Sequence, residues 1–300
     1  MKKIILFLFC ILFFSSPSFA KLKVVTTTPD LANLAQEVGK EFIEVKSIAR
    51  GDQDYHFLEP KPSYIVQASQ ADLLISVGLE LEVGWLPVLL TQSRNPKIQT
   101  SEKGFLDASQ NIPVMEIPTA RVDRSMGDVH PLGNPHYWLN PNNGILIAQA
   151  IAQRLSELDS AHASDYNQNF LNFKNQLSAK IANWQKQLAN LKGKKIITQH
   201  KSFSYFTDWT GLQVSGFVEP KPGIPPNPGH LLELIALIQK EKVPLIVTEN
   251  YYDTKAAQEL SQKTGSKLLI LPTSVGGEAN IKNYSDLFEN LISKINEALK

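Results

Sequence analysis

The sequence has 300 residues, of which 30 are Lys or Arg and 29 are Asp or Glu, and 43% are hydrophobic. Such balanced charge gives no broad electrostatic argument for binding nucleic acid, so we expect no nucleic-acid partner. The length suits two domains of ordinary size.

The first twenty residues predict an export signal. A basic start, Met1 to Lys3, precedes an apolar stretch from residue 4 to residue 14, and small residues follow up to Ala20. The stretch is too short for a membrane-spanning helix, which needs roughly 20 residues. We therefore expect cleavage after Ala20 and a periplasmic protein with 28 basic and 29 acidic residues. Cys10, the single cysteine, would leave with the signal, so the mature chain would have no disulfide, thiolate ligand or lipid-anchoring cysteine.

Strands and helices alternate through the first half of the mature chain. We expect strands at residues 22–27, 43–49 and 71–77, and helices at residues 31–38, 63–69, 85–90 and from Pro141 to Leu155. Asp30 is the expected N-cap of the first helix. Such alternation is typical of βαβ units and a mostly parallel sheet.

Residues 164–191 predict one long amphipathic helix. Its apolar residues recur at steps of three or four, and Gly193 ends the pattern. A helix of this length is a stiff rod of about 40 Å at 1.5 Å per residue. The apolar positions are Phe170, Phe173, Leu177, Ile181, Trp184 and Leu188.

The alternation then resumes, which predicts a second α/β lobe. The expected strands are residues 195–198, 212–217, 245–248 and 267–271, and the expected helices are residues 203–209, 230–240, 255–264 and 284–299. The predicted fold class is therefore α/β, with two βα lobes of mostly parallel sheets joined by one long rigid linking helix. The predicted divisions are a signal peptide (1–20), an N-terminal lobe (21–160), the linking helix (161–193) and a C-terminal lobe (194–300).

Three histidines lie in polar or turn-rich settings beside apolar runs: His56, His136 and His200. In parallel α/β sheets, ligands bind beyond the carboxyl ends of the strands. Two of these histidines follow predicted strands, and His136 precedes a helix, so the three could meet in a cleft between the lobes. Neutral imidazole is the commonest metal ligand, and three imidazoles suit zinc.

Several motifs in order give the chain a family resemblance. They are Val25 to Asp30, Gly51 to Ser63, Asn134 to Pro141, the long helix, and Thr198 to Phe206. With these motifs the chain resembles, over essentially its whole mature length, the zinc- and manganese-specific solute-binding proteins of bacterial ABC importers.

The resemblance implies a function. It predicts a non-enzymatic, monomeric carrier that captures a divalent metal ion as cargo and delivers it to an ABC permease membrane subunit. His56, His136 and His200 match the family's first three ligands. Manganese-binding relatives usually have glutamate at the third position, so histidine here favours Zn²⁺ over Mn²⁺.

The chain departs from the family at the fourth ligand. The family often has an aspartate after the strand that corresponds to residues 267–271, but this position is Thr273. Water could complete the shell, or another side chain could. The candidates are Glu249, at the end of the strand 245–248, and His130, on a short loop before His136; Glu249 ranks slightly first.

Two rival functions remain open. Three histidines and a water are also the zinc shell of a hydrolase, although the sequence has no His-Glu-x-x-His pattern. Alternatively, the histidines could contact an organic molecule or a metal chelate.

Two further expectations concern the surroundings of the histidines. Asp54 could orient His56 by accepting a hydrogen bond from its ring. The proline-rich segment 217–229 is interpreted as a stiff connector, or else as a rigid wall of the cleft or a surface that the permease contacts.

Overall fold

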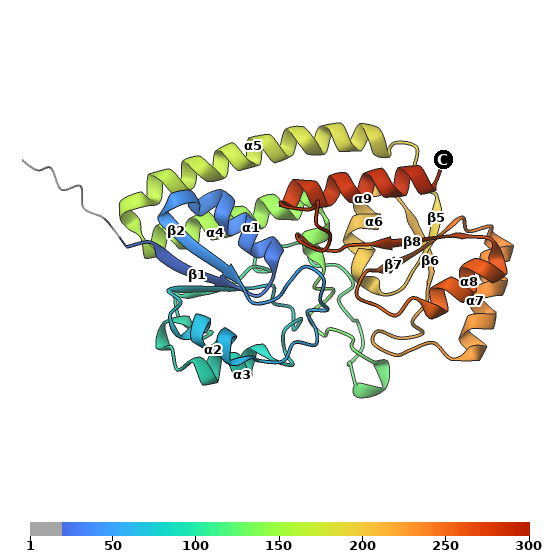
Figure 1. Cartoon of the computed structure of the whole chain (residues 1–300), viewed down its shortest axis with the longest axis horizontal. Coiled ribbons are helices and arrows are strands. Elements are labelled where there is room, and N and C mark those ends of the chain that lie inside the picture. Colours follow the sequence, from blue (N-terminus) through green and yellow to red (C-terminus); the bar gives the residue numbers. More distant parts are fainter. Residues whose placement is uncertain (1–19) are drawn as a thin grey trace, which may run out of the picture.

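The computed structural model describes residues 20–300, except for the side chain of Arg124. The predicted signal segment, 1–20, lies outside this range apart from Ala20. Within it, two four-stranded sheets, each entirely parallel, form two lobes side by side (Figure 1). The predicted fold class is confirmed. No helix among residues 20–300 has the length and hydrophobicity that crossing a membrane requires.

The N-terminal lobe has the strand order β2-β1-β3-β4. Its strands are β1 (Leu22–Thr26), β2 (Ile43–Ser47), β3 (Leu73–Ser76) and β4 (Phe105–Asp107), and its helices are α1 (Pro29–Gly39), α2 (Pro62–Ser69), α3 (Leu86–Ser93) and α4 (Pro141–Leu158). The prediction contained no strand at β4, which has only three residues. All four residues of β3 are buried, as expected for a strand covered on both faces.

The C-terminal lobe repeats this topology, with the order β6-β5-β7-β8. Its strands are β5 (Lys195–Thr198), β6 (Gln213–Phe217), β7 (Leu245–Glu249) and β8 (Lys267–Leu271), and its helices are α6 (Ser204–Thr210), α7 (Pro228–Glu241), α8 (Lys255–Thr264) and α9 (Tyr284–Ala298). In both lobes the first strand of the chain lies second in the sheet, so the first and third strands are central. The carboxyl ends of these strands lead into the functional loops described below.

Helix α5 (Ala163–Leu188) runs along both lobes, with α9 beside it (Figure 1). The predicted apolar stripe of α5 is buried from Phe170 to Leu188. Trp184 packs on Phe288 of α9, with ring centroids 5.5 Å apart. Burying a large apolar side chain stabilises by about 1.5–3 kcal/mol, so the stripe holds α5 firmly. The long helix that the sequence predicts therefore runs between the lobes, and α9 of the C-terminal lobe packs against it.

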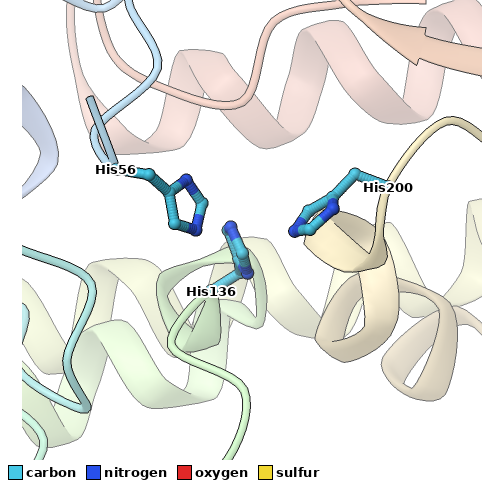
Figure 2. A group of neighbouring side chains, drawn as sticks. All are labelled: His56, His136 and His200. Atoms are coloured by element: carbon cyan, nitrogen blue, oxygen red, sulfur yellow. The ribbon is translucent and has the colours of Figure 1, made fainter. Parts of the chain in front are cut away.

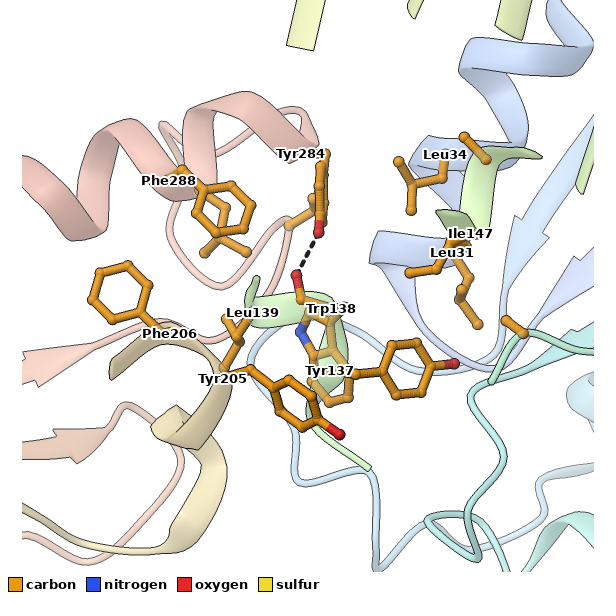
Figure 3. Close-up of a cluster of buried hydrophobic side chains, with 14 of the residues drawn as sticks. Leu31, Leu34, Tyr137, Trp138, Leu139, Ile147, Tyr205, Phe206, Tyr284 and Phe288 are labelled. Carbon is orange, nitrogen blue, oxygen red and sulfur yellow. Dashed lines mark hydrogen bonds between the residues drawn. The ribbon is translucent and has the colours of Figure 1, made fainter. Parts of the chain in front are cut away.

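Apolar residues of both lobes also meet between the sheets (Figure 3). Leu31 and Ile147 come from the N-terminal lobe, while Phe206 and Phe288 come from the C-terminal lobe. Tyr284, at the start of α9, donates a hydrogen bond to the carbonyl of Trp138. One continuous core thus fixes the base of the inter-lobe contact.

The N-cap of α1 is Thr28, whose side chain accepts a hydrogen bond from the backbone N–H of Leu31 at 3.4 Å. The predicted cap, Asp30, is wrong. Asp30 lies in the first turn of α1, where its carboxyl group accepts hydrogen bonds from the Ser274 side chain and from Val275 N–H, the latter at 3.1 Å. Burial raises the pKa of Asp30 to about 7. The residue therefore connects the two lobes instead of closing its own helix.

Candidate metal centre

The three predicted histidines come from three separate loops. His56 lies between β2 and α2, His136 immediately precedes the helical turn Tyr137–Leu139, and His200 follows β5 after one intervening residue. His136 and His200 are 2% and 4% exposed, and the His56 side chain is 10% exposed. The topology thus carries residues far apart in sequence to the facing ends of two sheets.

The three imidazoles converge (Figure 2). Their ring centroids form a nearly equilateral triangle, at 5.4 Å for His56 and His136, 5.7 Å for His56 and His200, and 5.4 Å for His136 and His200. One nitrogen of each ring lies within 4.8 Å of the others. Among residues 20–300, this is the only group of three or more His, Cys, Asp or Glu side chains that meets this distance. Its spacing suits a single ion bound to three nitrogens at about 2.1 Å.

An oxygen atom contacts Nδ1 of every ring. For His56 it is Asp54 Oδ1 at 2.6 Å, and for His200 it is Glu219 Oε2 at 2.8 Å. A carboxylate only accepts hydrogen bonds, so in a neutral imidazole Nδ1 carries the proton and Nε2 keeps its lone pair. Such outer partners orient metal-binding histidines and raise their basicity.

The same local motif builds two of the three positions. The oxygen Asn134 Oδ1 accepts hydrogen bonds from both the backbone N–H and Nδ1 of His136, each at 2.9 Å. Asp54 holds the backbone N–H of His56 in the same way at 3.0 Å. In each case an Asx residue two positions earlier forms an Asx turn, the usual local pairing of these side chains. The turn fixes the backbone and the ring together.

Burial and neighbouring charged groups set the protonation states of His136 and Asp54 in a way that favours binding of a cation. Burial, and then the neighbouring His56 and His200, hold the pKa of His136 well below its usual value. Burial acts to raise the pKa of Asp54, but hydrogen bonds from His56 outweigh it and hold that pKa below its usual range. His136 is therefore neutral, with a lone pair available, while Asp54 is ionised.

The two candidates for a fourth ligand lie in different places. His130 Nε2 lies 3.1 Å from His56 Nε2, and His130 lines a cavity of about 80 Å³ together with His136 and His200. Burial lowers the pKa of His130 to about 3. Glu249 is fully buried, lies outside the ligand group, and has no hydrogen-bond partner on either carboxyl oxygen among the described residues. Burial raises the pKa of Glu249 to about 8.

The segment at the family's aspartate position contacts the N-terminal lobe. The carbonyl of Thr273 accepts a hydrogen bond from Trp138 Nε1 at 2.8 Å, and Ser274 accepts one from the Tyr55 hydroxyl at 2.5 Å. Tyr55 is the residue that replaces the family's proline before His56. This segment therefore links the lobes through these hydrogen bonds and those to Asp30.

Two partners of the histidines were missed in the sequence reasoning. Asn134 could have been found, because Asn134-Pro135-His136 repeats the Asx-x-His spacing of Asp54-Tyr55-His56. Glu219 lies two residues beyond β6, inside the proline-rich segment that the sequence marked as a connector or cleft wall. The fold brings Glu219 to His200, which lies 19 residues earlier in the sequence.

Comparisons with known proteins agree with one another. Residues 24–298 match the family model described as the periplasmic zinc-uptake complex component A. The chain is 29% identical over 289 residues to a metal ABC transporter substrate-binding lipoprotein, ScbA, of Streptococcus cristatus, covering 93% of this chain and 89% of the relative. It is 30% identical over 289 residues to the manganese ABC transporter substrate-binding lipoprotein PsaA of Streptococcus pneumoniae, covering 94% and 84%.

Other similar proteins are named for other metals. The iron-binding protein YfeA of Yersinia pestis is 25% identical over 289 residues, covering 93% of this chain and 87% of the relative. A crystal structure of ZnuA superposes with a TM-score of 0.79 at 23% identity, covering 94% of this chain and all of the other. The solved structure thus shares the fold of this chain, while the names of the relatives and of the family include manganese, iron and zinc.

Proposed function

Because the chain belongs to the family of the periplasmic zinc-uptake component A, we propose that its cargo is zinc, bound through Nε2 of His56, His136 and His200. As a member of this family, it is an extracytoplasmic solute-binding protein of an ABC importer. It binds a divalent transition metal and delivers it to a membrane permease. The observation that carries the choice of residues is the arrangement of three rings whose Nδ1 atoms are all held from outside the cluster.

The donor set supports zinc over manganese. All three converging atoms are imidazole nitrogens, which suit Zn²⁺, whereas Mn²⁺ prefers carboxylate, carbonyl and water oxygens. The carboxylates that contact the rings, Asp54 and Glu219, do so at Nδ1 atoms on the outer side of the cluster. A manganese ion would have nitrogen ligands where its chemistry favours oxygen.

The same contacts support a carrier over a zinc hydrolase. A hydrolytic site needs an open coordination position and a free general base beside it. Asp54 and Glu219 are engaged with His56 and His200, so neither is positioned as that base. A carrier needs only to bind the ion and release it.

Isothermal titration of the metal-stripped protein with zinc and with manganese tests this proposal. We expect one zinc per chain and much weaker manganese binding. His136→Ala should lower zinc affinity by more than about 100-fold, beyond the loss typical of an outer partner. The control is His162→Ala, because His162 lies outside the cluster, where its ring contacts Asp159 at 2.6 Å. Equal losses in the two variants would refute the assignment of the site.

The proposal extends to processing and organisation. The mature protein would begin at Lys21 and act as a monomer, with lobes at 21–160 and 194–300 and the linking segment 161–193 between them. Mass spectrometry of the exported protein would test the first residue, and light scattering would test the monomer. A mature chain that still contains Cys10 would contradict cleavage after Ala20.

A further inference from the structure

The loop before His136, residues 121–133, crosses between the lobes, and we call it the strap. The backbone N–H of Asp128 donates a hydrogen bond to the carbonyl of Pro222 at 2.8 Å. Lys221 Nζ donates another to the carbonyl of Ser125 at 2.7 Å. The strap is therefore attached to the proline-rich segment 217–229 of the C-terminal lobe, although its sequence neighbours belong to the N-terminal lobe.

Two glycines make this close contact possible. Gly127 has φ +78°, and a Cβ there would lie 2.2 Å from the Pro222 carbonyl oxygen. Gly223 has φ +72°, and a Cβ there would lie 2.1 Å from Asp128 Oδ2. Both positions have a backbone conformation that favours glycine, and at Gly127 the Pro222 backbone also leaves no room for a side chain. The contact is thus built into the chain at both sides.

His130 is held at the cluster from the N-terminal lobe. Its ring hydrogen-bonds to the backbone of Leu79, which lies in a turn where Leu79 and Glu80 have φ of 51° and 65°. Non-glycine residues in this region cost of order 1 kcal/mol or more each. The buried Glu82 carboxyl stabilises the turn by accepting hydrogen bonds from Val77 N–H at 2.7 Å and Gly78 N–H at 3.1 Å.

The arrangement of His130 matches that of the other three histidines. The His130 ring has one polar contact outside the cluster and one nitrogen beside His56, while the group whose nitrogens all lie within 4.8 Å of one another consists of His56, His136 and His200. The contact between His130 Nε2 and His56 Nε2 is 3.1 Å. Zinc–nitrogen bonds of 2.0–2.1 Å at tetrahedral angles place neighbouring ligand nitrogens about 3.4 Å apart. To become two ligands of one ion, this hydrogen-bonded pair would separate by a few tenths of an ångström, and the His130 nitrogen would move closer to the rings of His136 and His200.

We infer that His130 is the fourth zinc ligand, completing a four-nitrogen shell with His56, His136 and His200; this rests on the proposed function. Glu249 does not fill this position, because neither of its carboxyl oxygens hydrogen-bonds to one of the rings and it does not line the cavity that His130 shares with His136 and His200. The fourth nitrogen leaves no open position for a water, and it adds to the preference for zinc over manganese. Because the strap is attached to both lobes, separating the lobes would draw this ligand from the ion.

A crystal structure of the zinc-loaded wild-type protein, with an anomalous map at the zinc edge, tests the ligand directly and needs no variant. We expect His130 Nε2 at about 2.1 Å from the ion. A water or a carboxylate oxygen in its place would overturn the inference.

Zinc titration of two variants supplies the second test. His130→Ala should weaken zinc binding at least about tenfold, and millimolar imidazole should restore part of the loss by filling the vacated position. Ser125→Ala is the matched control in the strap, because it keeps the carbonyl that Lys221 contacts and should bind as the wild type does. Unchanged affinity in His130→Ala would overturn the inference.

The proposed function fails separately, if the wild-type protein binds no zinc or if His136→Ala binds as tightly as the wild type. Zinc bound by three histidines and a water, with His130→Ala unaffected, would leave that function intact and remove only the fourth ligand.

Discussion

The third strand of each sheet leads to a buried glutamate, and the two glutamates differ in their surroundings. Beyond β3, Glu82 is 2% exposed and accepts three hydrogen bonds, from Thr27, Val77 and Gly78. At the end of β7, Glu249 is fully buried and has no partner among the described residues. Burial raises the pKa of Glu82 to about 7 and of Glu249 to about 8; part of the effect is offset at Glu82 by Thr27, Val77 and Gly78, and at Glu249 by the nearby Ser202 side chain. Equivalent topology therefore does not impose equivalent chemistry: one acid supports a strained turn, while the other is kept protonated.

The largest expected effect is the pH dependence of stability that Glu249 imposes on the metal-free protein. Its folded-state pKa of about 8 exceeds its ordinary value of 4.5, so the folded state binds more protons between these pH values. The free energy of unfolding should therefore fall as pH rises from about 4.5 to 8. At about 1.4 kcal/mol per pKa unit, the loss is up to about 5 kcal/mol. Urea unfolding of Glu249→Gln at several pH values should show a shallower decline than the wild type.

The exposed Glu259, on α8 of the same lobe, provides the control for this comparison. Glu259→Gln should follow the wild-type pH curve. If Glu249→Gln also runs parallel to the wild type, the two buried glutamates do not differ as we describe.

The second-largest expected effect is the difference in stability between Glu82→Ala and Glu249→Ala, which measures the hydrogen bonds of Glu82. Alanine at either position deletes the same atoms, but only Glu82→Ala leaves three donors without their acceptor. Each unpaired buried group costs about 1–3 kcal/mol, so Glu82→Ala should lower the free energy of unfolding by about 3 kcal/mol more than Glu249→Ala. Urea unfolding at pH 5, where both acids are protonated in the folded state, measures the difference. Equal losses would mean that the hydrogen bonds of Glu82 contribute no net stability.

Much of the architecture follows from local pattern. The alternation of strands and helices predicts both lobes, because parallel strands with helical crossovers have few other ways to pack. The three histidines can be singled out as candidate ligands because each lies in a distinctive polar motif. β4 escapes prediction because three residues, Phe105–Asp107, are too few to show a period.

What the sequence could not supply depends on contacts between distant segments. Thr28 and Asp30 are both good helix caps, and only the position of Ser274 in the other lobe explains why Asp30 turns away from α1. The partnership of His200 with Glu219, and the position of His130 at His56, also arise between loops. Such pairings are set by how the two lobes pack, which no local pattern encodes.

The lobes can also be compared through the acids that contact their histidines. Glu219 is 6% exposed, and it accepts hydrogen bonds from both His200 Nδ1 and Gly223 N–H. Glu219→Ala should leave the His200 ring without its orienting partner and lower zinc affinity by about 10–100-fold. Titration against a chelator of known affinity measures the loss. Glu233→Ala, which removes an acid from the same lobe that is 82% exposed, should have no effect; a comparable loss there would point to general destabilisation of the lobe.

The smallest effect is expected at Asp54, because the chain already contains the result of the substitution. Asn134 uses its amide oxygen to hold the backbone and ring of His136, just as Asp54 uses a carboxylate for His56. Asp54→Asn would keep this Asx turn and remove only a charge that is partly exposed, with 21% of the side chain accessible. Solvent weakens the interaction of such a charge with the bound ion, so zinc affinity should fall by less than about tenfold. A loss as large as that of Glu219→Ala would show that the ionised acid itself, and not the turn, holds His56 in position.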